Sequence, residues 1–163
     1  MFAAEVADRG ARFRAVSPTE LVDALSDEIA AAISFGLTDD LGATLPWAPR
    51  PHFADGDQPE TMLARGLLGI AASGSILVSE PRHDRLRIFL ARRLILLLPA
   101  AGIVAGVRDA APVLRGLAAA GRFATFVTGP SRTSDIEQIS IIGAHGPGDL
   151  AVFVVEDWRP DGG

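Results

Sequence analysis

Cysteine is absent from this chain of 163 residues, and so are lysine, tyrosine and asparagine. Without thiolates the chain itself cannot hold an iron–sulfur cluster, a cysteine-ligated zinc ion or a disulfide. Without lysine it has no Schiff-base amine and no P-loop cation, and without tyrosine it has no phenolic acid. The side chains left for chemistry are those of serine, threonine, aspartate, glutamate, histidine and arginine.

Positive charge and uninterrupted apolar sequence are also scarce. The net charge of −5 and the pI near 5.1 argue against a nucleic-acid binder, which would present a basic face. The longest apolar run, residues 88–107, is broken by Arg92 and Arg93 and then by Pro99 and Gly102, so we expect no membrane span. The acidic start of the chain has no apolar core of the signal-peptide kind. We therefore expect a soluble cytoplasmic protein.

The length predicts one domain of ordinary size, whose core needs neither a metal nor a disulfide. Strand-like apolar runs alternate with helical patterns through most of the chain. Residues 17–20, Ser-Pro-Thr-Glu, form a capping box that opens a helix to about Ala32. The strands on either side, 11–16 and 32–37, are expected to form a parallel pair. The predicted fold class is α/β, with a mostly parallel sheet and helices on both faces.

The first residues, 2–10, indicate a short helix ended by Gly10. Residues 38–59 predict loop with a short strand near Pro51, and helical spacing returns in residues 59–66. Further elements are expected as a helix over 84–91, a buried strand over 93–100 and an amphipathic helix over 107–120. The last of these is expected to turn Val113, Leu114 and Leu117 inward and to stop at Gly121.

Two short apolar runs in residues 67–81 are separated by Ala72-Ser73-Gly74-Ser75. This pattern fits either a bend within one strand or a tight hairpin, and the glycine permits close approach of another group. Ser73 and Ser75 offer hydroxyls and are candidate ligand-binding residues, but no G-x-S-x-G elbow surrounds them, which favours a turn over a nucleophile.

The stretch from Gly129 to Pro147 combines turn formers and ionisable groups between two strand patterns, 122–128 and 150–157. Gly129-Pro130 ends the first strand, and Ser131 or Thr133 can cap a helical turn over 134–138. A strand, a polar turn that opens a helix and a convergent loop are typical of a ligand site at the end of an α/β sheet.

Two interpretations of residues 129–133 remain open. Hydroxyls and backbone N–H groups opposite Arg132 would make an anion cradle, whereas pairing of Arg132 with Asp135 or Glu137 would make an ordinary capped turn. The two carboxylates share a face only on an extended segment, so acid/base chemistry by the pair depends on that conformation.

His145 lies in a second turn, residues 143–147, between glycines and before a proline. A loop position favours a polar role for this side chain over a role in the core. His52 and His83 show no ligand spacing to it, so no metal site is expected.

These motifs resemble a known family. GPSRTSDIE, residues 129–137, followed by GAHGP, residues 143–147, resembles the C-terminal signature of the LUD domain, the lactate-utilisation C-subunit family. GIAASGSILV, residues 69–78, is similar to a family segment that usually reads close to AIAETGTLVL. Residues 85–104 resemble the helix and strand that follow, so that the resemblance runs from about Leu67 to Glu156.

The resemblance implies a single LUD-like domain over residues 1–163, with a shortened N-terminal part that fits a fragment or a reduced homologue. It implies a three-layer α/β/α fold like that of the sugar-phosphate isomerase and CoA-transferase superfamily. It also implies a role in oxidising L-lactate to pyruvate as one of three proteins. The partner subunits would carry the iron–sulfur clusters, and this chain would need no cofactor of its own. Ala72 stands where the family usually has glutamate, so a carboxylate expected near the site is absent.

The family motif carries over onto Gly129, Ser131, Arg132, Thr133, Asp135, Glu137, His145 and Gly146. In the leading hypothesis Arg132 neutralises a small carboxylate, Ser131 and Thr133 donate hydrogen bonds, and His145 transfers a proton. A competing hypothesis is a non-catalytic assembly module of an iron–sulfur redox complex. A third, an enzyme for phosphorylated or CoA-linked substrates, rests on fold analogy alone, and the missing lysine counts against it.

Overall fold

The computed structural model describes residues 1–30, 32, 35–37, 41, 59–79, 87–134, 140–142 and 146–158. In chain order the elements are α1 (Phe2–Asp8), β1 (Arg12–Val16), α2 (Pro18–Ala30), β2 (Phe35–Leu37), β3 (Thr61–Arg65), β4 (Leu68–Ile70), β5 (Ser75–Val78), β6 (Arg93–Pro99), η1 (Ala100–Gly102), β7 (Ile103–Val104), η2 (Val107–Ala110), α5 (Ala111–Ala119), β8 (Thr125–Val127), β9 (Arg132–Ser134), β10 (Ser140–Ile142) and β11 (Asp149–Val155).

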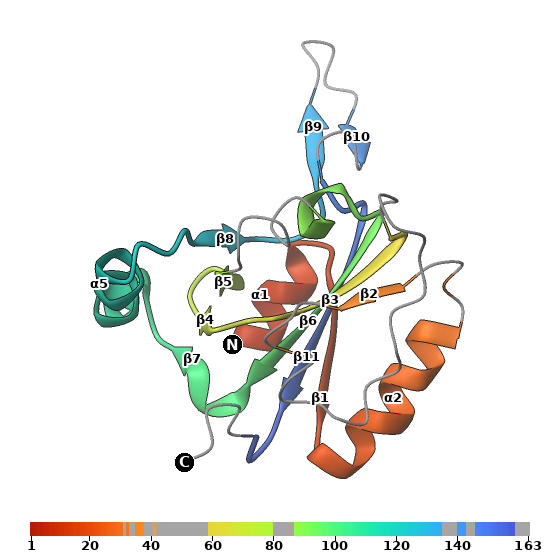
Figure 1. Ribbon diagram of the computed structural model, residues 1–163, viewed down its shortest axis with the longest axis horizontal. Helices are drawn as coiled ribbons and strands as arrows, with labels where there is room; N and C mark the ends of the chain where they lie inside the picture. The colour runs from red at the N-terminus through yellow and green to blue at the C-terminus, as the bar shows by residue number, and fades with distance from the viewer. Residues whose placement is uncertain are drawn as a thin grey trace.

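Five strands form a wholly parallel sheet, hereafter the main sheet, in the order β1-β11-β6-β3-β2 (Figure 1). The central strands β6 and β11 are buried along all but their first residue, because both their faces are apolar. The predicted parallel sheet is therefore confirmed. The predicted pairing of the strands around α2 is wrong, since β1 and β2 lie at opposite edges. β11, β6 and β3 separate them, and the long apolar strands β6 and β11 lie inside the sheet.

Layers cover both faces of the main sheet, as predicted. On one face Leu21, Leu25 and Ile29 of α2 pack in a cluster that includes Ile95 of β6 and Phe153 of β11. The other face is covered by α1 together with β4 and β5 (Figure 1). The three-layer α/β architecture is thus confirmed, with a layer opposite α2 that mixes helix and strand.

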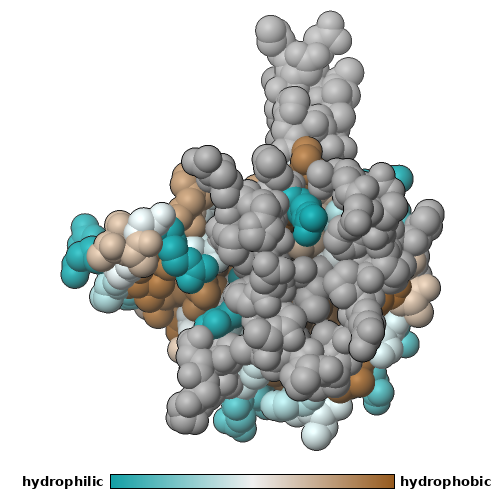
Figure 2. Space-filling model, in the orientation of Figure 1, coloured by the Kyte–Doolittle hydropathy of each residue, from teal (hydrophilic) through white to brown (hydrophobic). Residues whose placement is uncertain are grey.

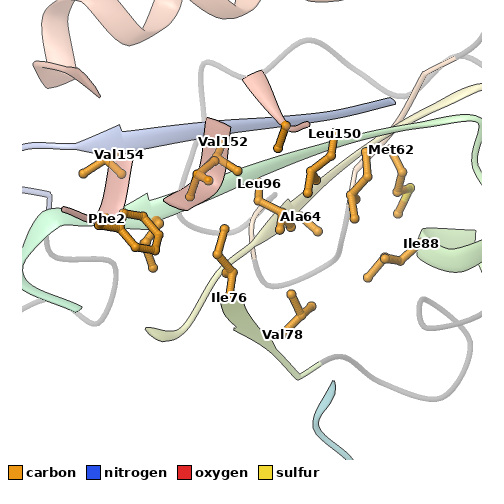
Figure 3. Close-up of a cluster of buried hydrophobic side chains, with 14 of the residues drawn as sticks. Phe2, Met62, Ala64, Ile76, Val78, Ile88, Leu96, Leu150, Val152 and Val154 are labelled. Carbon is orange, nitrogen blue, oxygen red and sulfur yellow. The ribbon is translucent and has the colours of Figure 1, made fainter. Parts of the chain in front are cut away.

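The larger core cluster lies between the main sheet and this mixed layer. Figure 3 shows Phe2 of α1 and Ile76 of β5 directed towards side chains of the main-sheet strands, among them Leu96 and Val152. Phe2 also meets Phe13 edge to face, with ring centroids 6.2 Å apart. The N-terminal helix is therefore an integral part of the core.

A second, four-stranded sheet has the order β7-β4-β5-β8. Its outer side packs against α5, where Leu114 and Leu117 are partly buried as predicted, and Figure 2 shows apolar atoms gathered between α5 and β7. Val113 is 36% exposed, so its predicted inward position is wrong. Gly121 follows the helix with φ of 64° and ends it, as expected.

The capping box that opens α2 is confirmed. The Ser17 backbone N–H donates to the Glu20 carboxylate over 2.9 Å, and the Glu20 N–H donates to Ser17 Oγ over 3.3 Å. These bonds hold the negative charge at the helix start, and the backbone hydrogen bond is the main reason why the pKa of Glu20 is lowered. The short N-terminal helix ended by Gly10 is confirmed as well, because α1 ends at Asp8 and Gly10 has a φ of 84°.

The helical spacing of residues 59–66 is misleading, since Thr61–Arg65 form β3. Met62, Leu63 and Ala64 are fully buried between β2 and β6, and burial on both faces overrides a short helical pattern. Of the two alternatives predicted for residues 67–81, the hairpin is correct, because β4 and β5 pair antiparallel. Residues 87–90 are helical, in agreement with part of the helix expected over 84–91. Most of the loop predicted over 38–59, including the strand near Pro51, lies outside the described residues.

Candidate functional site

The loops of the Gly129 to Pro147 stretch join the body of the protein at the amino ends of β6 and β11. The Ser131 N–H donates to the Pro147 carbonyl over 2.7 Å. The next residue, Gly148, donates its N–H to the Arg92 carbonyl over 2.9 Å, immediately before β6 begins. Ligands of open α/β sheets usually bind at the carboxyl ends of the strands. The candidate site of this protein adjoins the opposite edge.

Three hydroxyl groups, those of Ser73, Ser75 and Thr128, form a continuous hydrogen-bonded row, hereafter the hydroxyl chain. The Oγ atoms of Ser73 and Ser75 are 2.8 Å apart, and Ser75 Oγ is 2.8 Å from Thr128 Oγ1. The Ser75 backbone N–H also donates to Ser73 Oγ over 3.4 Å. The turn between β4 and β5 therefore touches the residue that precedes Gly129, and two motifs far apart in sequence become neighbours.

Both turns pack against backbone of the N-terminal segment, the β4–β5 turn on α1 and the Gly129 turn on Arg9, which caps the end of α1. Gly74 has φ of 67°, and a Cβ at this position would lie 2.8 Å from the Glu5 carbonyl carbon and the Val6 nitrogen. Gly129 has φ of 87°, and its Cβ would lie 2.7 Å from the Arg9 carbonyl oxygen. Glycine is needed at both positions, for the left-handed backbone and for the close approach. The sequence predicted that another group could approach Gly74 closely, and the structure shows that this group is the backbone of α1. The N-terminal segment thus contacts both turns.

The second loop of the candidate site packs directly on the first. A Cβ on Gly146 would lie 3.2 Å from Ser131 Cβ and 3.5 Å from Ser131 Oγ. Together with the hydrogen bond from Ser131 to Pro147, this contact brings Gly129, Ser131 and Gly146 into one region, as the sequence grouped them.

The helical turn predicted over residues 134–138 is wrong for Ser134. This residue ends β9, which pairs antiparallel with β10 in the register Ser134 to Ser140 and Arg132 to Ile142. β-Branched residues at Thr133, Ile141 and Ile142 favour extended structure. The hairpin rises from the body of the protein (Figure 1), so Arg132 and Thr133 lie on a strand rather than in a capped turn. Asp135, Glu137 and His145 lie outside the described residues.

A cluster of four charged side chains lies beside the site, at the start of β11. The Asp149 carboxylate accepts hydrogen bonds from Arg12 over 3.0 Å and from Arg93 over 2.9 Å. Glu28 of α2 pairs with both arginines, and its hydrogen bond is the main cause that raises the pKa of Arg12. These groups are partly exposed, so each pair contributes only about 0.2–1 kcal/mol. The cluster contains two positive and two negative charges. We interpret it as a set of ion pairs that link the start of β11, the strand after the second loop, to β1, β6 and α2.

Sequence reasoning missed Thr128 as a member of the site. The sequence shows that Thr128 precedes Gly129, but it does not show that Thr128 contacts Ser75, which lies 53 residues earlier. The contact depends on the register of β5 against β8, in which Ile76 pairs with Val127. No local pattern specifies that register.

Within the part of the chain that the structure describes, no group of three or more histidine, cysteine, aspartate or glutamate side chains could hold a metal ion. No described helix is both long and apolar enough to cross a bilayer.

Comparison with known proteins gives consistent matches. The family model described as LUD domain matches residues 59–155, more than half of the chain. This chain is also similar to proteins named Lactate utilization protein C. One from Shouchella clausii is 35% identical over 92 residues, which cover 54% of this chain and 40% of that protein. One from Geobacillus kaustophilus is 30% identical over 119 residues, covering 68% and 50%. The chain thus spans half or less of the length of these two relatives.

Matches from Deinococcus radiodurans cover more of the chain. A Lactate utilization protein C from that organism is 28% identical over 172 residues, covering 94% of this chain and 77% of that protein. The crystal structure of a DUF162 family protein from the same organism has a TM-score of 0.73 and 22% sequence identity, covering 94% of this chain and 93% of that chain. At that identity the structural match supports the fold alone.

Proposed function

This chain belongs to the LUD-domain family, and on that premise we propose that it serves lactate utilisation by binding a small carboxylate at the loops of the candidate site. The observation that carries the proposal is the junction of two polar turns, in which the hydroxyl chain links the β4–β5 turn to Thr128 beside Gly129. The names of the relatives from Shouchella clausii and Geobacillus kaustophilus support lactate as the carboxylate.

The residue types of the site suit recognition of a 2-hydroxy or 2-oxo acid. In this proposal Arg132 neutralises the carboxylate, Ser131 and Thr133 donate hydrogen bonds, and His145 accepts or returns the proton of the substrate hydroxyl. Asp135 and Glu137 are the further acid/base candidates.

Oxidation of lactate to pyruvate also removes two electrons from the substrate. A chain without cysteine does not suit an iron–sulfur cluster, so the proposal assigns electron transfer to cysteine-rich partner subunits and treats this chain as one subunit of a cytoplasmic complex.

An assembly role is the second candidate, and the β9–β10 hairpin is the observation that favours it. A two-stranded hairpin is marginally stable by itself, and contact with another chain would stabilise one that projects from the body (Figure 1). In this case the loops would form an interface, and the protein would co-purify with redox partners without binding small acids.

A thermal-shift series separates the two candidates. A ligand that binds only the folded state raises the melting temperature, by the equivalent of about 2.7 kcal/mol at a concentration one hundred times Kd. We expect L-lactate or pyruvate to raise it, phosphate and a phosphosugar to leave it unchanged, and Arg132→Ala to abolish the rise. Arg108→Ala, an exposed charge removal on η2, serves as the control and should keep the rise. No shift with either acid would favour the assembly role.

A further inference from the structure

The hydroxyl chain has one hydrogen more than it uses internally. Three hydroxyl groups carry three hydrogens, and the two contacts between them use two. The middle residue, Ser75, is 9% exposed, whereas Thr128 lies at the exposed end of the row. Among the described residues, the Thr128 hydroxyl meets Ser75 and no other hydrogen-bonding group.

The direction of the chain determines where the spare hydrogen lies. Either oxygen of each contact can be the donor, because a hydroxyl oxygen can accept two hydrogen bonds, so the spare hydrogen lies at one end of the row, on Ser73 or on Thr128. When an acceptor such as a carboxylate lies at the exposed end, the row runs from Ser73 to Ser75 to Thr128, and the Thr128 hydrogen is donated to that acceptor. Hydrogen bonds in series polarise one another, which makes the terminal hydroxyl a stronger donor than an isolated threonine.

A contrasting hydroxyl lies at the other end of the same strand pair. Ser79 follows β5, is 2% exposed and donates its hydroxyl to the Phe123 carbonyl over 2.7 Å. That hydrogen is consumed inside the protein, so Ser79 only ties β5 to the segment that leads into β8. Ser75 and Thr128 tie the opposite end, but with a donor left over beside Gly129.

We propose that Thr128 is a direct ligand-binding residue of the candidate site, whose hydroxyl, polarised by Ser75 and Ser73, donates to the carboxylate of a bound 2-hydroxy or 2-oxo acid. This inference rests on the proposed function and adds a residue to it. It assigns Ser73 and Ser75 a supporting role behind Thr128 rather than direct contact with the ligand.

Isothermal titration calorimetry with L-lactate and with pyruvate tests the assignment. Thr128→Val keeps the shape of the side chain and removes the hydroxyl, and we expect Kd to rise about ten-fold or more, as for a lost hydrogen bond to a charged group. Thr128→Ser keeps the donor and should stay within about three-fold of the parent protein. Ser75→Ala leaves Thr128 in place but removes its support, and Kd should rise by roughly three- to ten-fold.

Ser79→Ala is the matched control, because it removes a buried hydroxyl from the same strand pair. Its melting temperature should fall while Kd stays unchanged. Unchanged affinity in Thr128→Val or in Ser75→Ala would overturn the inference and leave the proposed function intact. If the parent protein bound neither acid, both the inference and the proposed function would be contradicted.

Discussion

The Gly129→Ala variant is expected to lose roughly 2–6 kcal/mol of unfolding free energy, and to lose binding of small acids with it. A residue with a side chain is strained by about 1–3 kcal/mol at a left-handed position such as φ 87°. The added Cβ would also lie 2.7 Å from the Arg9 carbonyl oxygen, which belongs to the backbone and cannot swing away. Forcing atoms into packed structure adds about 1–3 kcal/mol. Urea unfolding measures the loss, and calorimetry with L-lactate measures binding.

Two other glycines allow the backbone strain and the steric overlap expected in Gly129→Ala to be measured separately. Gly121 has φ of 64°, and a Cβ added there would have no atom within 4 Å, so Gly121→Ala should cost only the strain of about 1 kcal/mol. Gly116 lies in α5 with equally open space, and Gly116→Ala should stabilise the protein by about 0.5–1 kcal/mol. A Gly129→Ala loss no larger than that of Gly121→Ala would contradict the close packing of this turn on α1.

The Leu96→Ala variant is expected to be destabilised by about 2–5 kcal/mol. Leu96 lies in β6, the central strand of the main sheet, is fully buried, and packs in the cluster shared with α1 and β5 (Figure 3). Truncation removes apolar contacts and leaves a cavity that strands paired on both sides cannot collapse. Because the same cluster supports the two turns, amide exchange at Gly74 and Gly129 should accelerate as well.

Leu90→Ala provides the control with the same chemical change. Leu90 is 59% exposed, and its truncation should alter stability by no more than about 0.5 kcal/mol. Similar losses in the two variants, measured by urea unfolding, would be incompatible with the described core.

The sequence predicted those elements whose signals are local. The capping box at Ser17 and Glu20 marks the start of α2, and the apolar runs of β6 and β11 mark the centre of the sheet. The family was identified from short motifs, and the family model over residues 59–155 confirms it. These predictions were correct because neighbouring residues alone specify the features.

Features that depend on distant partners were not predictable. The expected pairing of the strands around α2 failed because β11 and β6, far along the chain, insert between them. The helical spacing of 59–66 was overridden by pairing with β2 and β6. The contact of Ser75 with Thr128 required the register between β5 and β8. The proposed roles of Arg132 and His145 remain predictions.

The most direct test of the candidate site is a titration of isotopically labelled protein with L-lactate, followed in the amide nitrogen–proton NMR spectrum. Binding at the amino edge of the main sheet predicts saturable shifts of the Thr128, Gly129, Ser131 and Gly146 amides, with Gly121 unchanged. Shifts confined to the carboxyl ends of the strands, around Glu156, or a spectrum that lactate leaves unchanged, would contradict the proposed site.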